Sequence, residues 1–147
     1  MDKYTTLESI INAKKIHEVQ MTKIKASING VIVKAPTQTS KEKCAFGNWL
    51  YDEQYHLREI LGSMFYDKIE TLHARWHIEY LKIFEIFFKE RKKGFFNKML
   101  GTSKVSTMEL DKAKMYYFEL EATSKELFKA LESSQRRIAA LAESKFY

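Results

Sequence analysis

Residues 64–93 read MFYDKIETLHARWHIEYLKIFEIFFKERKK and decide the fold of this chain. Large apolar side chains recur there at every third or fourth position, the spacing that places side chains on one face of an α-helix. We therefore predict a long helix from about Met64 to about Lys93, ended by Gly94 or Gly101. Its buried face consists of Phe65, Ile69, Leu72, Trp76, Tyr80, Ile83 and Phe87.

Two further long helices flank this stretch. The first is expected from about Tyr4 to about Val33, because the residue before a proline is disfavoured in a helix and Ala35-Pro36 follows. The last is expected over residues 106–145, since Ser106-Thr107-Met108-Glu109 has the spacing of a capping box. Its apolar seam runs from Leu110 to Leu141 in steps of three and four, and could face either a bundle core or a dimer partner. The apolar stripe of the first helix consists of Leu7, Ile10, Met21, Ile24, Ile28 and Val31.

The segment between the first two long helices carries shorter elements. Residues 37–43 form a polar loop, and Cys44–Tyr51 follows as a short helix or turn. Residues 52–63 have the weakest pattern, which we interpret as a turn with a short helix up to Gly62.

The composition also favours a helical protein. The chain has 147 residues, of which 45% are hydrophobic, with only one Pro and five Gly. So few helix breakers favour a handful of long helices, since sheets need frequent turns. We therefore predict an all-α, up-and-down helical bundle of about four helices with a short Cys-bearing helix. It is expected to be a single domain over residues 1–147, with a core in 4–100 and the long C-terminal helix in 106–145.

The charged residues do not indicate a nucleic-acid or membrane partner. The net charge is +6, but 25 basic residues are mixed with 19 acidic ones, which is typical of solvated helix faces. We interpret the basic and aromatic segment around 89–98 as a charged helix end and a loop that packs two Phe into the core, with contact to a membrane surface as the less favoured alternative. Charges interrupt every apolar cluster, and the first residues lack the pattern of a signal peptide. A lone cysteine cannot form a disulfide within the chain, so we expect a soluble, cytoplasmic protein.

His73 and His77 are two of only four histidines, and they are four positions apart in the central helix. Residues at i and i+4 lie on one helix face about 6 Å apart, so both imidazoles can reach one metal ion. Two histidines can share a face by chance, so this pair alone is a moderate indication of a metal site.

His17 strengthens the prediction that this histidine pair binds a metal. It lies seven residues after Ile10 and four before Met21, which places it in a core position of the first helix. A lone core histidine is more often hydrogen-bonded to a hydroxyl or a carbonyl than to a metal. Together with the two other histidines and Cys44, however, it completes three nitrogen donors and one thiolate, a full tetrahedral set for Zn²⁺.

Cys44 follows Lys41 and Lys43 and is expected near the start of the short helix. Positive charges and a helix N-terminus lower a thiol pKa, which favours the thiolate that zinc requires. The other interpretation of a free cysteine is a small buried apolar residue. We interpret the remaining histidine, His56, as a surface residue, with an exchangeable fifth metal ligand as the less favoured alternative.

The string Cys44-Ala45-Phe46-Gly47-Asn48-Trp49-Leu50-Tyr51 resembles the signature of the chemoreceptor zinc-binding domain (CZB), a family of bacterial sensors. That family carries Cys-x-Phe-Gly-x-Trp in a short helix, after a long helix with one His and before a long helix with HxxxH. The chain matches the ligand positions in the same order, and the resemblance covers the first helix through the HxxxH helix. It implies a bundle, often homodimeric, that binds Zn²⁺ through His17, Cys44, His73 and His77.

The resemblance also implies a function. Members of the family sense zinc, or hypochlorous acid through the cysteine, and signal to chemotaxis or cyclic-di-GMP machinery. The domain is usually attached to a chemoreceptor or a diguanylate cyclase. The motifs of neither are visible here, so the resemblance implies a chemoreceptor or diguanylate cyclase partner in trans.

Two other functions remain to be weighed against sensing. A purely structural, zinc-stabilised adaptor would use the last helix as its docking surface, with metal binding contributing folding energy. A di-iron oxygen carrier is disfavoured, because two irons need more ligands than four histidines with scattered carboxylates supply. An enzyme is not expected, since a site with four protein ligands has no open position for water.

Overall fold

The computed structural model describes residues 1–31, 34–88 and 105–146, and every regular element in these ranges is a helix. The predicted all-α class is therefore confirmed. The elements are α1 (Lys3–Ile28), α2 (Ala45–Leu50), the 3-10 turn η1 (Glu53–Tyr55), α3 (Leu57–Leu61), α4 (Ser63–Phe87), α6 (Thr107–Ala140) and the 3-10 turn η2 (Glu143–Lys145).

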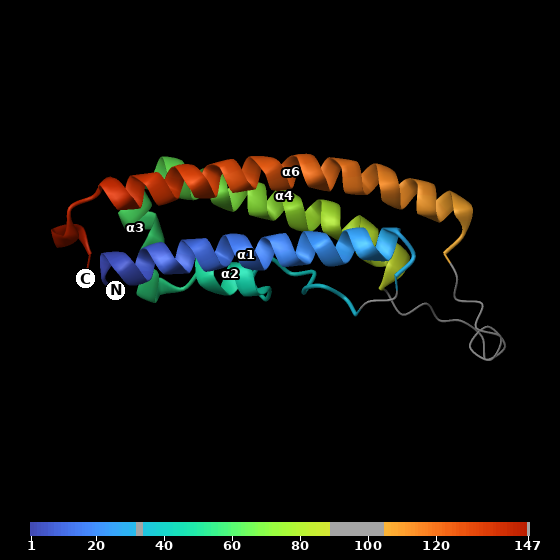
Figure 1. Ribbon diagram of the computed structural model, residues 1–147, viewed down its shortest axis with the longest axis horizontal. Helices are drawn as coiled ribbons and strands as arrows, with labels where there is room; N and C mark the ends of the chain where they lie inside the picture. Colours follow the sequence, from blue (N-terminus) through green and yellow to red (C-terminus); the bar gives the residue numbers. More distant parts are fainter. Residues whose placement is uncertain (32–33, 89–104, 147) are drawn as a thin grey trace.

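The three long helices lie side by side, with α1 and α4 running in one direction and α6 in the other (Figure 1). The short elements α2, η1 and α3 occupy the return path between α1 and α4, which completes an up-and-down bundle. Both ends of the chain lie at the same end of the bundle (Figure 1), where Lys3 Nζ donates to the Leu141 carbonyl at 2.8 Å. Within the described ranges, no helix has both the length and the apolar character needed to cross a membrane.

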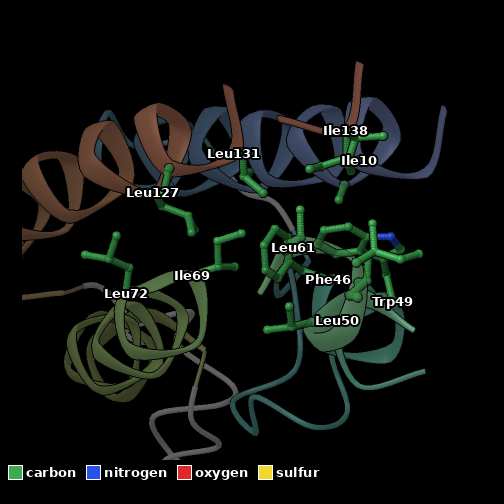
Figure 2. Close-up of a cluster of buried hydrophobic side chains, with 14 of the residues drawn as sticks. Ile10, Phe46, Trp49, Leu50, Leu61, Ile69, Leu72, Leu127, Leu131 and Ile138 are labelled. Carbon is green, nitrogen blue, oxygen red and sulfur yellow. The ribbon is translucent and has the colours of Figure 1, made fainter. Parts of the chain in front are cut away.

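The apolar core consists of two clusters. The lower cluster packs the short elements against the long helices (Figure 2), and includes Ile10, Phe46, Leu50, Leu61, Ile69, Leu127 and Leu131. The upper cluster lies toward the end of the bundle away from the chain termini and includes Met21, Ile24, Trp76, Tyr80, Ile83 and Leu120. The seam of α6 contributes to both clusters, so it faces the bundle core and is not left for a dimer partner.

A polar layer lies between the two clusters. It consists of His17, His73 and Ser124, one residue from each long helix, all buried. In α6, for example, Leu120 belongs to the upper cluster and Leu127 to the lower one, and Ser124 lies between them. The candidate metal site therefore lies where the two halves of the core meet.

The first helix ends earlier than the expected boundary near Val33. Gly30 has φ +88°, a conformation that favours glycine, and the Gly30 and Val31 N–H groups donate to the carbonyls of Ser27 and Ala26. These two bonds form a Schellman motif, which ends α1 at Ile28. Val31, expected in the buried stripe, is 56% exposed because it lies beyond this stop.

The last helix begins as predicted but ends earlier. The Glu109 N–H donates to Ser106 Oγ at 3.1 Å, so Ser106 caps α6 at its start. At the other end Leu141 adopts an extended backbone and packs against the lower cluster, so residues 106–145 do not form one helix. The expected stops at Gly94 and Gly101 and the basic segment lie outside the described residues.

Candidate metal centre

Three of the four predicted ligands converge in the structure. One ligand atom from each of Cys44, His73 and His77 lies within 4.8 Å of the other two, and all three residues are buried. Their positions follow from local structure: the two histidines share one face of α4, and Cys44 caps the start of α2. The site thus joins the short Cys-bearing helix to the central helix.

The geometry at Cys44 fits a zinc ion. Cys44 Sγ lies 3.3 Å from His73 Nε2 and accepts a hydrogen bond from the Gly47 N–H at 3.1 Å. Two donors bound tetrahedrally to one zinc ion, at the usual bond lengths, lie about 3.5 Å apart. The observed sulfur–nitrogen separation matches this spacing. The site is therefore shaped to take a zinc ion without moving these two side chains far.

The thiol itself departs from expectation. Burial raises the pKa of Cys44, and this outweighs the opposing hydrogen bond from the Gly47 N–H. The expectation that Lys41 and Lys43 lower this pKa is wrong. Lys41 Nζ binds Glu70 Oε1 at 2.6 Å, and Lys43 is exposed. A bound cation is thus the group that favours the thiolate here.

His77 is held in a defined protonation state. Its Nδ1 lies 2.9 Å from the Thr39 carbonyl oxygen, which can only accept, so Nδ1 carries the proton. The Nε2 atom therefore keeps the lone pair that a metal needs. Burial lowers the pKa of His77, so the ring is neutral at neutral pH.

His73 presents Nε2 to the cysteine, while its Nδ1 is buried with no hydrogen-bond partner among the described residues. Burial, followed by the neighbouring His77, lowers the pKa of His73 to about 3. Nε2 is therefore the ring nitrogen placed to bind a metal beside Cys44. Within the described part of the chain, Nδ1 lacks the fixed acceptor that metal-bound histidines usually have.

His17 is buried but does not join the other three ligand atoms. Its Nε2 lies 3.1 Å from Ser124 Oγ, and its ring packs edge-on against Trp76 with the ring centres 4.9 Å apart. Burial, with a smaller effect of His77, lowers the pKa of His17 to about 3. The fourth position of the predicted ligand set thus stays a prediction.

His56 lies apart from these residues, as its interpretation as a surface residue predicts. It is exposed, has φ 49°, and stands between η1 and α3 with Nδ1 3.8 Å from Glu59 Oε2. Nothing in this position brings its ring toward the buried cluster.

Several residues around the site were not predicted from the sequence. Thr39 and Ser124 hold histidine nitrogens, and Glu70 binds both Lys41 and the Tyr51 hydroxyl. Glu70 lies one turn before His73 on α4, so a carboxylate at that spacing was the one available signal. Thr39 acts through its backbone carbonyl, which no side-chain pattern reports.

A buried thiol and neutral imidazoles between the helices of a bundle define a metal-binding helical domain, with donors of the kind zinc prefers. Residues 17–83 match the family model of the chemoreceptor zinc-binding domain. The matched segment contains all four predicted ligands. The chain is therefore a zinc-binding sensory domain with Zn²⁺ as its cofactor. No curated protein and no solved structure matches it.

Proposed function

We propose that this domain senses zinc, an oxidant or both through one closed centre held by His17, Cys44, His73 and His77. The observation that carries the proposal is the convergence of the single cysteine of the chain with the helical histidine pair. Four protein donors leave no open coordination position, so the centre is not expected to activate water and the chain is not expected to be an enzyme. A signal can then change two properties of the centre: its occupancy by zinc and the oxidation state of the Cys44 sulfur.

A cavity beside Cys44 supports the oxidant response. A partly open cavity of ≈ 420 Å³ reaches Cys44, with Gln20, Thr39 and Phe84 among its lining residues. A small oxidant such as hypochlorous acid can approach by this route. The thiolate sulfur then attacks the chlorine of hypochlorous acid and hydroxide leaves. Water hydrolyses the resulting sulfenyl chloride to a sulfenic acid, which releases chloride and a proton. The thiolate donor is lost, and the link between α2 and α4 weakens.

The output is proposed to lie with a partner. By its family, the domain would act in the cytoplasm as a homodimer and signal in trans to a chemoreceptor or a diguanylate cyclase. Deleting the chain is expected to change swimming bias or cyclic-di-GMP level in response to zinc or hypochlorous acid. A chain with Cys44→Ala should fail to restore the response. Full restoration by that variant would contradict sensing through the thiolate.

Metal analysis of the purified protein tests the centre itself. We expect about one zinc per chain, lost or greatly weakened by Cys44→Ala and by His73→Ala. His56→Ala is the matched control, since it removes a histidine outside the buried cluster. Zinc content that is unchanged in the Cys44 and His73 variants would contradict the proposed site.

Titration with hypochlorous acid separates the two signals. We expect zinc release to follow the oxidation of Cys44, with both monitored in the same sample by a zinc-binding dye and by intact mass. Metal that stays bound after Cys44 is fully oxidised would leave zinc occupancy as the only signal.

A structural adaptor is the second candidate function. The seam of α6 is buried in the bundle, but on its outer face Phe118 is 76% exposed and Met115 is also exposed. In an adaptor, a partner would bind this face equally well with and without zinc. Partner affinity that changes on zinc removal would favour the sensor.

A further inference from the structure

Ser124 of α6 occupies the point where the three long helices meet. It is 2% exposed, and its hydroxyl lies within hydrogen-bonding distance of three side chains. These contacts are His17 Nε2 at 3.1 Å, Trp76 Nε1 at 3.0 Å and Met21 Sδ at 3.1 Å. One residue of α6 thus contacts both α1 and α4 beside the candidate metal centre.

What each atom can donate or accept limits the proton positions in this group to two arrangements. A serine hydroxyl has one proton and two lone pairs, and an indole N–H can only donate. Trp76 therefore fills one lone pair, while in the first arrangement the hydroxyl proton points to Met21 Sδ. With that proton directed at the thioether, the second lone pair can accept a proton from His17 Nε2; in the other arrangement the hydroxyl donates to Nε2 and the proton of the ring is on Nδ1. In a neutral imidazole, the first arrangement leaves the lone pair on Nδ1.

We propose that Ser124 is a positioning residue for zinc, holding His17 by Nε2 so that Nδ1 is the nitrogen offered to the metal. The inference rests on the proposed function, in which His17 is the fourth ligand. Metal-binding histidines usually donate their second ring N–H to a fixed acceptor, which sets the tautomer and the ring orientation. Thr39 does this for His77 through Nδ1, so the two histidines use opposite nitrogens.

The consequence concerns α6, which supplies none of the four ligands. Through Ser124, this helix contacts a residue of the proposed centre, so a change in the position of His17 would shift or break a contact with α6. The connection would also explain why a serine, with no apolar side chain to bury, stands in the buried seam between Leu120 and Leu127.

Zinc affinity, measured by competition with a chromophoric chelator, tests the proposal. We expect Ser124→Ala to weaken zinc binding by about tenfold or more, the usual effect of removing such an outer partner. Ser134→Ala is the matched control, since Ser134 is also buried on α6 but its Oγ contacts no hydrogen-bonding group in the part of the chain described. Its zinc affinity should equal that of the wild type.

A double-mutant cycle distinguishes positioning from general loss of packing. If Ser124 acts through His17, Ser124→Ala should cause no further loss of zinc affinity in a His17→Ala background. Independent, additive losses would overturn the proposal. So would an unchanged or tighter affinity in the single Ser124→Ala variant, and the tighter result would mean that Ser124 competes with the metal for the His17 nitrogen.

Long-range ¹H–¹⁵N NMR of the zinc-loaded wild type avoids any folding defect in the variants. We expect His17 to carry its proton on Nε2 and bind through Nδ1, while His77 shows the opposite pattern in the same spectrum. Metal bound through Nε2 of His17 would overturn the inference.

The two levels of the argument can fail separately. A wild-type protein that takes up no zinc, or a Cys44→Ala variant that binds as well as the wild type, contradicts the proposed centre. If zinc affinity depends on Cys44 and His17 but is unchanged by Ser124→Ala, only the role of Ser124 is contradicted.

Discussion

At the scale of single residues, Gly47 permits the close approach on which the metal centre depends. A Cβ at this position would lie 1.7 Å from the Lys41 carbonyl oxygen and 3.3 Å from Cys44 Sγ. The loop before α2 therefore folds back over a residue that has no side chain. Because the Gly47 N–H also binds the cysteine sulfur, any shift of the loop moves a ligand.

Gly47→Ala is expected to weaken zinc binding by about tenfold or more, because the Lys41 carbonyl must move away and carries the loop before Cys44 with it. The measurement is zinc affinity together with the free energy of unfolding. Gly30→Ala is the control, since it strains a positive φ far from the site, where nothing lies within 4 Å of the new Cβ. Equal zinc affinities in both variants would contradict the role given to Gly47.

The buried histidines predict how stability depends on pH. In the metal-free protein, the pKa values of His17 and His73 are lowered from 6.5 to about 3. As the pH falls below 6.5, the unfolded chain therefore binds protons that the folded chain excludes. The contribution of these two histidines to the free energy of unfolding is fully present above pH 6.5 and is lost as the pH falls toward 3. Each histidine contributes a slope of about 1.4 kcal/mol per pH unit.

Urea denaturation of chelator-treated protein at several pH values between 6 and 4 measures this slope. His17→Asn should reduce the slope by about 1.4 kcal/mol per pH unit, because one excluded proton is removed. An identical slope in the variant would show that His17 is protonated equally in the folded and unfolded chains.

The sequence was enough to predict the group of Cys44, His73 and His77, because thiol and imidazole donors are rare here and the two histidines are one helical turn apart. The full ligand set with His17 stays a prediction. The hydrogen-bond partners of the histidines could not be predicted from the sequence. Thr39 contributes a backbone carbonyl, and Ser124 comes from a helix more than a hundred residues from His17. Such partners depend on tertiary packing, which no local pattern records. The direction of the Cys44 pKa shift was mispredicted for the same reason, since the burial that raises this pKa arises only in the folded bundle.

At the scale of elements, a polar clamp fastens the cysteine loop to α4. Glu70 accepts from Lys41 Nζ, at 2.6 Å, with one carboxylate oxygen and from the Tyr51 hydroxyl with the other. Lys41 precedes α2 and Tyr51 follows it, so both ends of this short helix are tied to one carboxylate. Burial and the neighbouring Glu70 raise the pKa of Tyr51, which keeps its hydroxyl a donor.

Glu70→Gln is expected to lower both stability and zinc affinity, since the charge-assisted bond to Lys41 is lost and the loop holding Cys44 is less constrained. A partly exposed pair of this kind contributes about 1 kcal/mol, or roughly fivefold in affinity. Asp67→Asn is the control. Asp67 lies one turn before Glu70 on α4, and the substitution breaks its exposed ion pair with Arg58. Equal effects of the two substitutions would argue against a clamp.

Helix boundaries show where local sequence was sufficient. Ser106 was predicted as a cap from its spacing to Glu109 and is one. The end of α1 was predicted from Pro36 and placed too late. The helix ends before Asn29-Gly30, a sequence that also favours a helix end. The end of α6 had no such signal, because Leu141 leaves the helix to pack against the lower cluster. That contact exists only in the assembled bundle.

At the scale of the whole molecule, the candidate metal centre lies between the upper and lower apolar clusters, and with His17 as the proposed fourth ligand it would join three separate segments of the chain. Bound metal should therefore stabilise the bundle as a whole. At a free zinc concentration of 100 times Kd, the linkage contributes about 2.7 kcal/mol. For a chain of this length, that corresponds to a rise in Tm of about 5–10 °C.

Thermal denaturation at increasing free zinc checks this expectation, with Cys44→Ala as the control that should show little or no shift. The single-domain organisation over residues 1–147 stays a prediction. One cooperative transition, shifted as a whole by zinc, would support it, whereas a shift confined to part of the transition would contradict it.

The polar layer also has a consequence for the alignment of the helices. If α6 slid by one heptad, Tyr117 or Leu131 would take the place of Ser124. Leu131 would leave the buried His17 Nε2 without its partner, at a cost of about 1–3 kcal/mol. Single buried polar residues fix the register of coiled coils in this way. The contact between His17 and Ser124 thus favours one register of α1 against α6, and the same register keeps the two apolar clusters on either side of the polar layer.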